Sequence, residues 1–156
     1  GNKTAQMIER LEEDCINLKP APTVISLLTG INDYSASYVQ IGKGNPEKYE
    51  KDLRELLTKI TTQLPNVRLI VMEPYAFKGI RDKIDGFLPD FYSYQPIARK
   101  LAEEFNAVFI PLQELFDEAI KNSSLKSFSA DGVHPASAGI ELISRSWLNV
   151  VEVRES

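Results

Sequence analysis

The chain has 156 residues, of which 43% are hydrophobic and 26% are charged, a size and composition typical of one globular domain with a real core. Its net charge of −4 argues against a nucleic-acid partner, because such domains carry a basic stripe. No apolar run approaches the roughly 20 residues that a membrane span needs. A single cysteine, Cys15, and a single histidine, His134, exclude a disulfide framework and the usual zinc ligand sets. We therefore expect neither metal nor cofactor, and the lone cysteine slightly favours the cytosol without deciding the compartment.

Apolar residues recur along the chain in two alternating patterns. Helical spacing predicts helices over residues 7–18, 45–64, 97–105, 112–120 and 140–151. Short apolar runs predict strands at 23–28, 67–72 and 107–110. Asn45 followed by Pro46 marks the start of the second helix, because Asn is a favoured cap and Pro a favoured first helical residue.

The alternation of strands with helices predicts an α/β domain whose parallel sheet is covered on both faces. In such sheets, ligands bind beyond the carboxyl ends of the strands. Three strands are few for this architecture, which usually has about five or six. We therefore expect residues 1–156 to form a single, N-terminally truncated domain that lacks its first two strands.

The segment from Asp131 to Pro135 carries the clearest chemical signal. Asp131 precedes His134 by three residues, directly before the last predicted helix. An acid that holds an imidazole in one tautomer makes that imidazole a usable general base. Taken alone, the feature is weak: a lone histidine before proline is more often structural. Asn32 and Asp33, which follow Gly30, also suit a turn and a helix cap.

Three short motifs together are more specific than any one of them. They are Gly1-Asn2-x-Thr4, Gly30-x-Asn32-Asp33 and Asp131-x-x-His134-Pro135, in that order. Over its whole length the chain resembles the SGNH hydrolases, the superfamily of the GDSL lipases and esterases. Within it, the chain looks most like the bacterial branch of carbohydrate acetyl esterases and lysophospholipase-like enzymes. The resemblance implies a flavodoxin-like three-layer sandwich.

The resemblance also implies a role for each matching residue. Asp131 and His134 would be the catalytic acid and base, while the Gly1 N–H and the Asn32 side chain would donate to the oxyanion. Gly30 and Asp33 would support the Asn32 motif. The family's nucleophile is the serine of a Gly-Asp-Ser block, which this sequence lacks. We therefore expect that serine to lie upstream of Gly1, and the chain alone to be inactive.

A serine within the chain is a poor replacement for this nucleophile. Ser26 lies in a predicted buried strand, and no evident helix start presents Ser35 or Ser37. Ser129 is too close in sequence to Asp131 to form an independent nucleophile arm. No Gly-x-Ser-x-Gly elbow occurs either. We therefore predict that the nucleophile lies outside the chain.

The leading hypothesis is a serine esterase that hydrolyses small-molecule esters, with short acyl groups on carbohydrate preferred over lysophospholipids or aryl esters. One alternative is an inactive fragment that only binds a partner. Another is a flavodoxin-like domain that uses Asp33, Asp131 and Mg²⁺ for phosphoryl transfer, although no phosphate-binding loop is present. We also expect self-association through strand 23–28, because loss of its neighbours would expose its edge.

Overall fold

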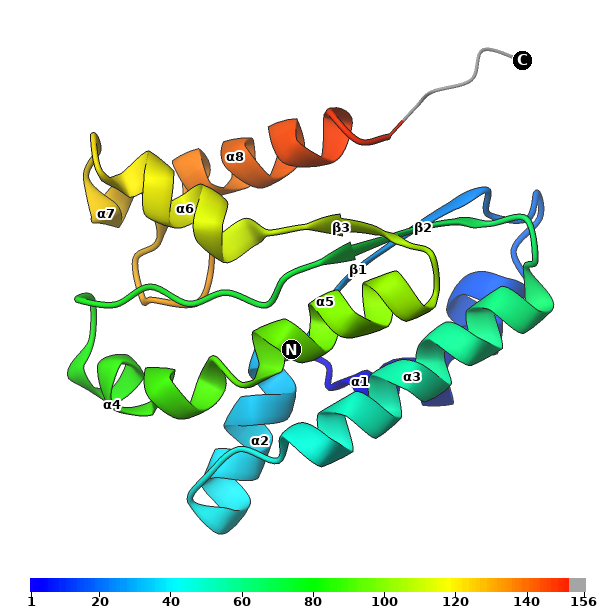
Figure 1. Ribbon diagram of the computed structural model, residues 1–156, viewed down its shortest axis with the longest axis horizontal. Coiled ribbons are helices and arrows are strands. Elements are labelled where there is room, and N and C mark those ends of the chain that lie inside the picture. Colours follow the sequence, from blue (N-terminus) through cyan, green and yellow to red (C-terminus); the bar gives the residue numbers. More distant parts are fainter. Residues whose placement is uncertain (152–156) are drawn as a thin grey trace.

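The computed structural model describes residues 1–151, which form a parallel sheet between two layers of helices (Figure 1). The sheet order is β1-β2-β3, with strands β1 (Val24–Leu28), β2 (Arg68–Met72) and β3 (Val108–Ile110). The helices are α1 (Thr4–Glu9), the π-helix η1 (Glu12–Ile16), α2 (Ile31–Ile41), α3 (Pro46–Gln63), α4 (Asp82–Phe91), α5 (Tyr94–Glu104), α6 (Leu112–Ile120), α7 (Leu125–Phe128) and α8 (Ser137–Leu148). The predicted α/β class with a parallel sheet is confirmed.

Side chains alternate across the central strand and so build a separate core on each face of the sheet. Leu69 and Val71 pack into the layer that holds α1, α3 and α5. Ile70, between them, packs against the layer of α6, α7 and α8, where Phe116 and Phe128 are buried. Figure 1 shows the sheet between these two layers. Burial on both faces explains why β2 reads as a continuous apolar run. In β1, Ser26 and Leu28 are exposed, so the expectation that Ser26 lies in a buried strand is wrong.

Several elements match the ranges predicted from the sequence. All three strands fall within the predicted segments, and α6 spans the predicted residues. Helix α3 starts at Pro46, and the Asn45 side chain caps it by accepting from the Lys48 N–H at 3.0 Å. Strong local signals and tertiary packing therefore agree in this part of the chain.

Three helices, α2, α4 and the short α7, were not expected, and the last helix differs from its prediction. Helices α2 and α4 occupy segments for which no helix was predicted, so Asn32 and Asp33 lie in the first turn of a helix rather than in an isolated turn. Helix α8 ends at Leu148 instead of residue 151. Ile140, at the start of the apolar pattern that predicted this helix, is 55% exposed.

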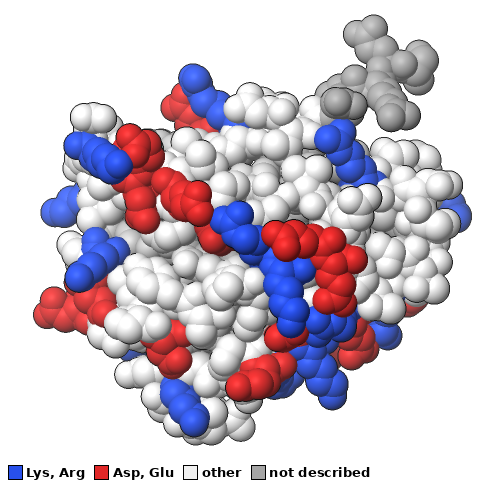
Figure 2. All heavy atoms as spheres, viewed as in Figure 1, with Lys and Arg blue, Asp and Glu red and all other residues white. Residues whose placement is uncertain are grey.

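Charged side chains of both signs are mixed over the surface. On the face drawn in Figure 2, Lys and Arg lie beside Asp and Glu. One group joins Arg54 to Glu50 and Glu104, and Lys100 to Glu50. None of the helices within residues 1–151 has both the length and the apolar character required to cross a bilayer.

Candidate active site

The loop between α7 and α8 holds an aspartate and a histidine in direct contact. Asp131 Oδ2 lies 2.7 Å from His134 Nδ1, and its Oδ1 accepts from the backbone N–H groups of Val133 and His134 at 3.0 and 2.9 Å. Desolvation acts to raise the pKa of Asp131, but the hydrogen bonds from His134 and Val133 hold it well below its usual range. An ionised carboxylate therefore faces Nδ1 and leaves Nε2 of the exposed ring free.

Ser129 stabilises this loop through hydrogen bonds to its backbone. Its buried hydroxyl donates to the backbone oxygen of His134 at 2.7 Å and accepts from the Gly132 N–H at 2.9 Å. Ser129 also pairs with Pro135 in an isolated antiparallel bridge. The hydroxyl is thus occupied with backbone groups. Sequence reasoning missed this bracing role, because no motif distinguishes a buried serine from an exposed one.

Asn32 lies in the first turn of α2, directly beyond the carboxyl end of β1. Its Nδ2 is 3.4 Å from the backbone oxygen of Asn2, so the start of the chain reaches the same place. Gly30 begins the helix with a φ of +129°, which side-chain-bearing residues rarely adopt. A Cβ on Gly30 would also stand 3.0 Å from Pro74 and 3.2 Å from the Tyr49 hydroxyl.

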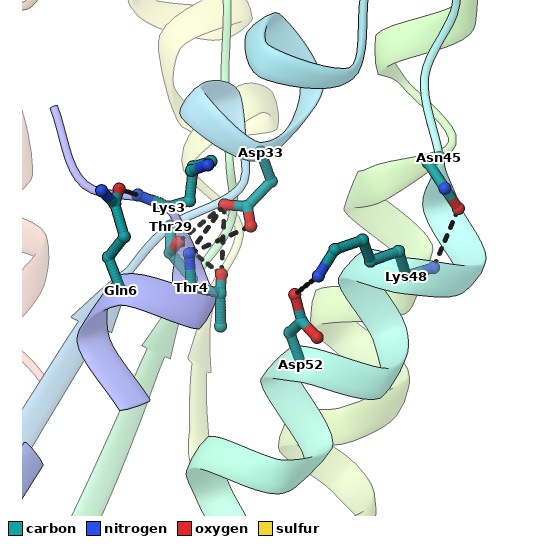
Figure 3. A network of polar contacts seen from close by, with 8 residues as sticks. All are labelled: Lys3, Thr4, Gln6, Thr29, Asp33, Asn45, Lys48 and Asp52. Carbon is teal, nitrogen blue, oxygen red and sulfur yellow. Dashed lines mark hydrogen bonds and ion pairs between the residues drawn. The ribbon is translucent and has the colours of Figure 1, made fainter. Parts of the chain in front are cut away.

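Asp33 joins the start of the chain to the start of α2, as Figure 3 shows. Its carboxylate accepts from the Thr4 N–H at 3.0 and 3.2 Å, and from the hydroxyls of Thr4 and Thr29 at 3.1 and 3.2 Å. Burial raises the pKa of Asp33, and these hydrogen bonds offset only part of the increase. The network fixes Thr4 and so places the exposed Gly1 and Asn2 near Asn32.

One cavity connects the two motifs at the carboxyl edge of the sheet. It has a volume of about 180 Å³ and is lined by Leu28, Thr29, Ile31, Asn32, Pro74, Tyr75, Val133 and Pro135. Asn32 and both chain neighbours of His134 therefore border the same space, although Asn32 and His134 belong to segments far apart in the sequence. The Phe77 N–H also donates to the Gly132 oxygen at 2.8 Å, which fixes the chain after β2 against the histidine loop.

Tyr75 is a wall of this cavity that sequence reasoning did not single out. It is 6% exposed and packs against Phe77 and Phe116. Burial first, and then the negative charge of Asp131, raise the pKa of Tyr75 to about 12. The phenol therefore stays neutral near Asp131 across the ordinary pH range.

The arrangement suits proton transfer by an imidazole next to a polarising amide. His134 has its Nδ1 engaged by a carboxylate, while Asn32 supplies an N–H donor at the edge of the shared cavity. Within residues 1–151, no three His, Cys, Asp or Glu side chains are grouped closely enough to hold a metal ion. Asp33 and Asp131 are each bonded to protein donors.

Comparisons with known proteins give a consistent picture. The model of the GDSL-like lipase/acylhydrolase family matches residues 1–142. An acetylxylan esterase of Geobacillus stearothermophilus is 28% identical over 97% of this chain and 68% of its own length. A crystal structure of an acetylxylan esterase from that organism superposes with a TM-score of 0.78, covering 99% of this chain and 71% of that one.

A second solved structure is more similar in sequence. It is a protein from Parabacteroides merdae described as a GDSL-like lipase, 39% identical, with a TM-score of 0.85 over 95% of this chain and 67% of that one. The family match covers all three motifs named above and the residues between them. The chain therefore belongs to the GDSL-like lipase/acylhydrolase family of ester hydrolases.

Proposed function

We propose that this protein hydrolyses short acyl esters, with acetyl groups on carbohydrate as the preferred substrates, by a Ser-His-Asp mechanism. The observation that carries the proposal is the Asp131–His134 pair beside the cavity that Asn32 lines. His134 Nε2 takes the proton of the attacking serine and later returns it to the leaving alcohol. Asp131 holds the imidazole in the required tautomer and stabilises its cationic form.

Asn32 and the Gly1 N–H are the proposed donors to the oxyanion of the tetrahedral intermediate. Asn32 already points an N–H toward the start of the chain, at the oxygen of Asn2. Gly30 and Asp33 support this geometry, because Gly30 permits the entry into α2 and Asp33 fixes Thr4. Such donors act on the transition state more than on the substrate, so they lower the barrier rather than tighten binding.

We place the nucleophile outside the 156 residues. Within residues 1–151, no serine hydroxyl is hydrogen-bonded to His134 Nε2, and Ser129 is engaged with backbone groups. The similar Geobacillus esterase has catalytic mutants at one serine, one aspartate and one histidine. Its aspartate and histidine are three positions apart, as Asp131 and His134 are. In that esterase, the serine lies further upstream of the aspartate than Gly1 lies upstream of Asp131 here. This spacing supports a nucleophile outside the 156 residues.

The test uses the protein expressed from its complete gene. Hydrolysis of p-nitrophenyl acetate and of acetylated xylo-oligosaccharides is measured for the wild type, for His134→Ala and for Asp14→Asn. The last variant is a matched control, because it removes a carboxylate from a surface pair with Arg10. We expect turnover without added metal, lost in His134→Ala and retained in the control. Inhibition by a chelator would instead favour the Mg²⁺ alternative, and no turnover would favour an inactive remnant.

A serine-directed fluorophosphonate then locates the nucleophile by mass spectrometry of the labelled peptide. We expect the label on a serine outside residues 1–156. Labelling of any serine within them would overturn this part of the proposal. The 156-residue chain alone should not hydrolyse p-nitrophenyl acetate faster than its own His134→Ala variant.

We also propose that the isolated 156-residue chain self-associates through β1, one of the two outer strands of the described sheet. Thr23 O accepts from the Arg68 N–H, and bonding alternates along a parallel strand, so the Ser26 N–H points away from β2. An unpaired edge recruits other strands. Sedimentation should show concentration-dependent association that Ser26→Pro reduces, because proline removes this N–H. A monodisperse wild-type monomer would contradict the proposal.

A further inference from the structure

A second cavity lies between α2 and α4, with a volume of about 210 Å³. It is lined by Tyr34, Ser35, Tyr38, Val39, Arg81, Lys83, Ile84 and Phe87. This is below the roughly 300–1,000 Å³ of pockets that enclose a drug-sized ligand, so it suits one ring-sized group. We call it the α2–α4 groove.

The α2–α4 groove adjoins the candidate active site on both of its sides. Ser35 follows Asn32 by three residues on α2, so the two side chains share one face of the helix. On the other side, Ile84 packs directly on the histidine loop. Its side chain lies 3.3 Å from the point that a Cβ would occupy if Gly132 carried a side chain. The groove is therefore linked to the candidate active site through α2 on one side and through the histidine loop on the other.

Aromatic rings form the floor of the groove. Tyr34 is fully buried and lies 4.9 Å from the Phe87 ring and 5.9 Å from the Tyr38 ring, centroid to centroid. Tyr38 remains 38% exposed, so part of this aromatic surface faces solvent. The C–H face of a pyranose ring is apolar and loses contact with water when it covers such a surface.

Two cations border the aromatic floor. Arg81 and Lys83 line the groove, no acid does, and neither cation forms an ion pair among the residues that the structure describes. The nearby Asp85 accepts from the Gly79 N–H at 2.8 Å. Arg81 is also the N-cap of α4, whose first turn carries Asp82 and Asp85. The groove is thus apolar on its floor and cationic at its rim.

From this combination we propose that the α2–α4 groove binds a uronic-acid unit in the alcohol part of the ester. The sugar ring lies over Tyr38 and its carboxylate faces Arg81 and Lys83. The inference rests on the proposed ester hydrolysis, and it names acidic oligosaccharides as the substrate class. A guanidinium suits a carboxylate because it donates two parallel hydrogen bonds to it.

The test compares an acetylated xylo-oligosaccharide that carries a glucuronic-acid branch with the same oligosaccharide lacking it. The variant is Arg81→Gln/Lys83→Gln, in the protein expressed from its complete gene. We expect KM for the acidic substrate to rise about three- to tenfold, the effect of losing one or two exposed ion pairs. KM for the neutral substrate and turnover of p-nitrophenyl acetate should not change. Tyr38→Ala should raise KM for both oligosaccharides.

A matched control removes two positive charges elsewhere. Lys51→Gln/Lys59→Gln alters the outer face of α3, and it should leave the ratio of the two KM values unchanged. Equal KM values for both oligosaccharides in the wild type would overturn the groove assignment while leaving ester hydrolysis intact. Competition by a lysophospholipid, but not by free glucuronate, would also overturn it.

If the protein hydrolyses no ester at all, direct binding still decides the assignment. Calorimetric titration with an oligoglucuronate then tests the groove without any turnover. Heat that is lost in Arg81→Gln/Lys83→Gln supports the groove, and no heat with the wild type rejects it. Failure of the proposed function and failure of this inference therefore give different results.

Discussion

The fold shifts the pKa values of two aspartates near the same edge of the sheet in opposite directions. Asp33 is surrounded by the amide and hydroxyl donors of Thr4 and Thr29, and burial raises its pKa. Asp131 is braced by backbone amides and an imidazole, and its pKa lies well below the usual range despite some desolvation. Aspartate side chains thus have two roles here: Asp33 anchors the fold, and Asp131 orients the imidazole of His134.

The two regions also differ in how far their partners lie along the chain. Thr4, the main partner of Asp33, is 29 residues away, whereas the partners of Asp131 lie within three residues. A long-range contact holds elements together, so its loss weakens the fold. A local turn has other bonds, including those of Ser129, so loss of the Asp131 charge leaves it closed. Activity and stability should therefore separate between the two sites.

The largest expected effect is on turnover at the Asp131 site. In the protein expressed from its complete gene, Asp131→Asn should lower kcat for p-nitrophenyl acetate by about 10,000-fold, because the imidazole loses its orienting acid. The urea midpoint of unfolding at pH 7 should fall less than in Asp33→Ala, because the Asn side-chain oxygen still accepts from the Val133 and His134 amides. Retained turnover would remove Asp131 from the mechanism and erase the contrast with Asp33.

The next effect concerns Asn32, whose loss should affect turnover less than the loss of Asp131 and stability less than the loss of Asp33. Asn32→Ala should lower kcat by about 100- to 1,000-fold with KM nearly unchanged, as expected for one lost oxyanion donor. Its side chain makes only a long contact with the Asn2 oxygen, so the stability cost should be small. A rise in KM at constant kcat would show that Asn32 binds substrate rather than the transition state.

Asp33→Ala should act chiefly on stability. The change leaves the Thr4 N–H and one of the two threonine hydroxyls without an acceptor, because the hydroxyls of Thr4 and Thr29 still hydrogen-bond to each other at 2.8 Å. Unsatisfied groups cost about 1–3 kcal/mol each when buried. We expect a loss of about 2–3 kcal/mol in the free energy of unfolding, measured with urea at pH 7. Asp33→Asn keeps one acceptor and should recover part of it. An equal loss in Asp131→Asn would break the contrast between the two regions.

The sequence predicted the three strands and the last helix, but neither α2, which carries Asn32, nor α4. Residues Ile31–Ile41 contain Asn, Asp, Ser and β-branched residues, all of which have weak helix propensity. Helix α2 forms because Tyr34 is fully buried against the rings of α4 and α5. Such packing involves residues distant in sequence, so a local pattern gave no sign of it.

Helix α4 escaped prediction for a related reason. It contains Gly86 and Pro89, both of which lower helix propensity, yet Phe87 and Leu88 are buried.

The pairing of Asp131 with His134 was predictable, because a spacing of three residues closes within one turn. The Asp33–Thr4 contact was not, because 29 residues separate its ends. Local contacts could be inferred from the sequence, and long-range ones depended on the fold.

The smallest effect is a difference in how stability depends on pH. It directly tests the opposite pKa shifts of Asp33 and Asp131. A group whose pKa is raised by folding binds more protons in the native state. Asp33 should therefore make the protein less stable as pH rises from its ordinary carboxyl pKa of 3.8 through its raised native value. Asp131, whose pKa is lowered, should make the protein lose stability as pH falls below 3.8. The two contributions have opposite sign and occupy different windows.

Urea unfolding between pH 2.5 and 6 measures both contributions when each variant is compared with the wild type. Asp33→Asn removes the loss of stability with rising pH above 3.8 and leaves the acid limb unchanged. Asp131→Asn removes part of the loss below 3.8 and leaves the upper window unchanged. Asp14→Asn, in a surface pair with Arg10, serves as the control and should follow the wild type in the upper window. If both site variants changed the same window in the same direction, the two carboxylates would share one environment. The division between an anchoring and a catalytic aspartate would then be wrong.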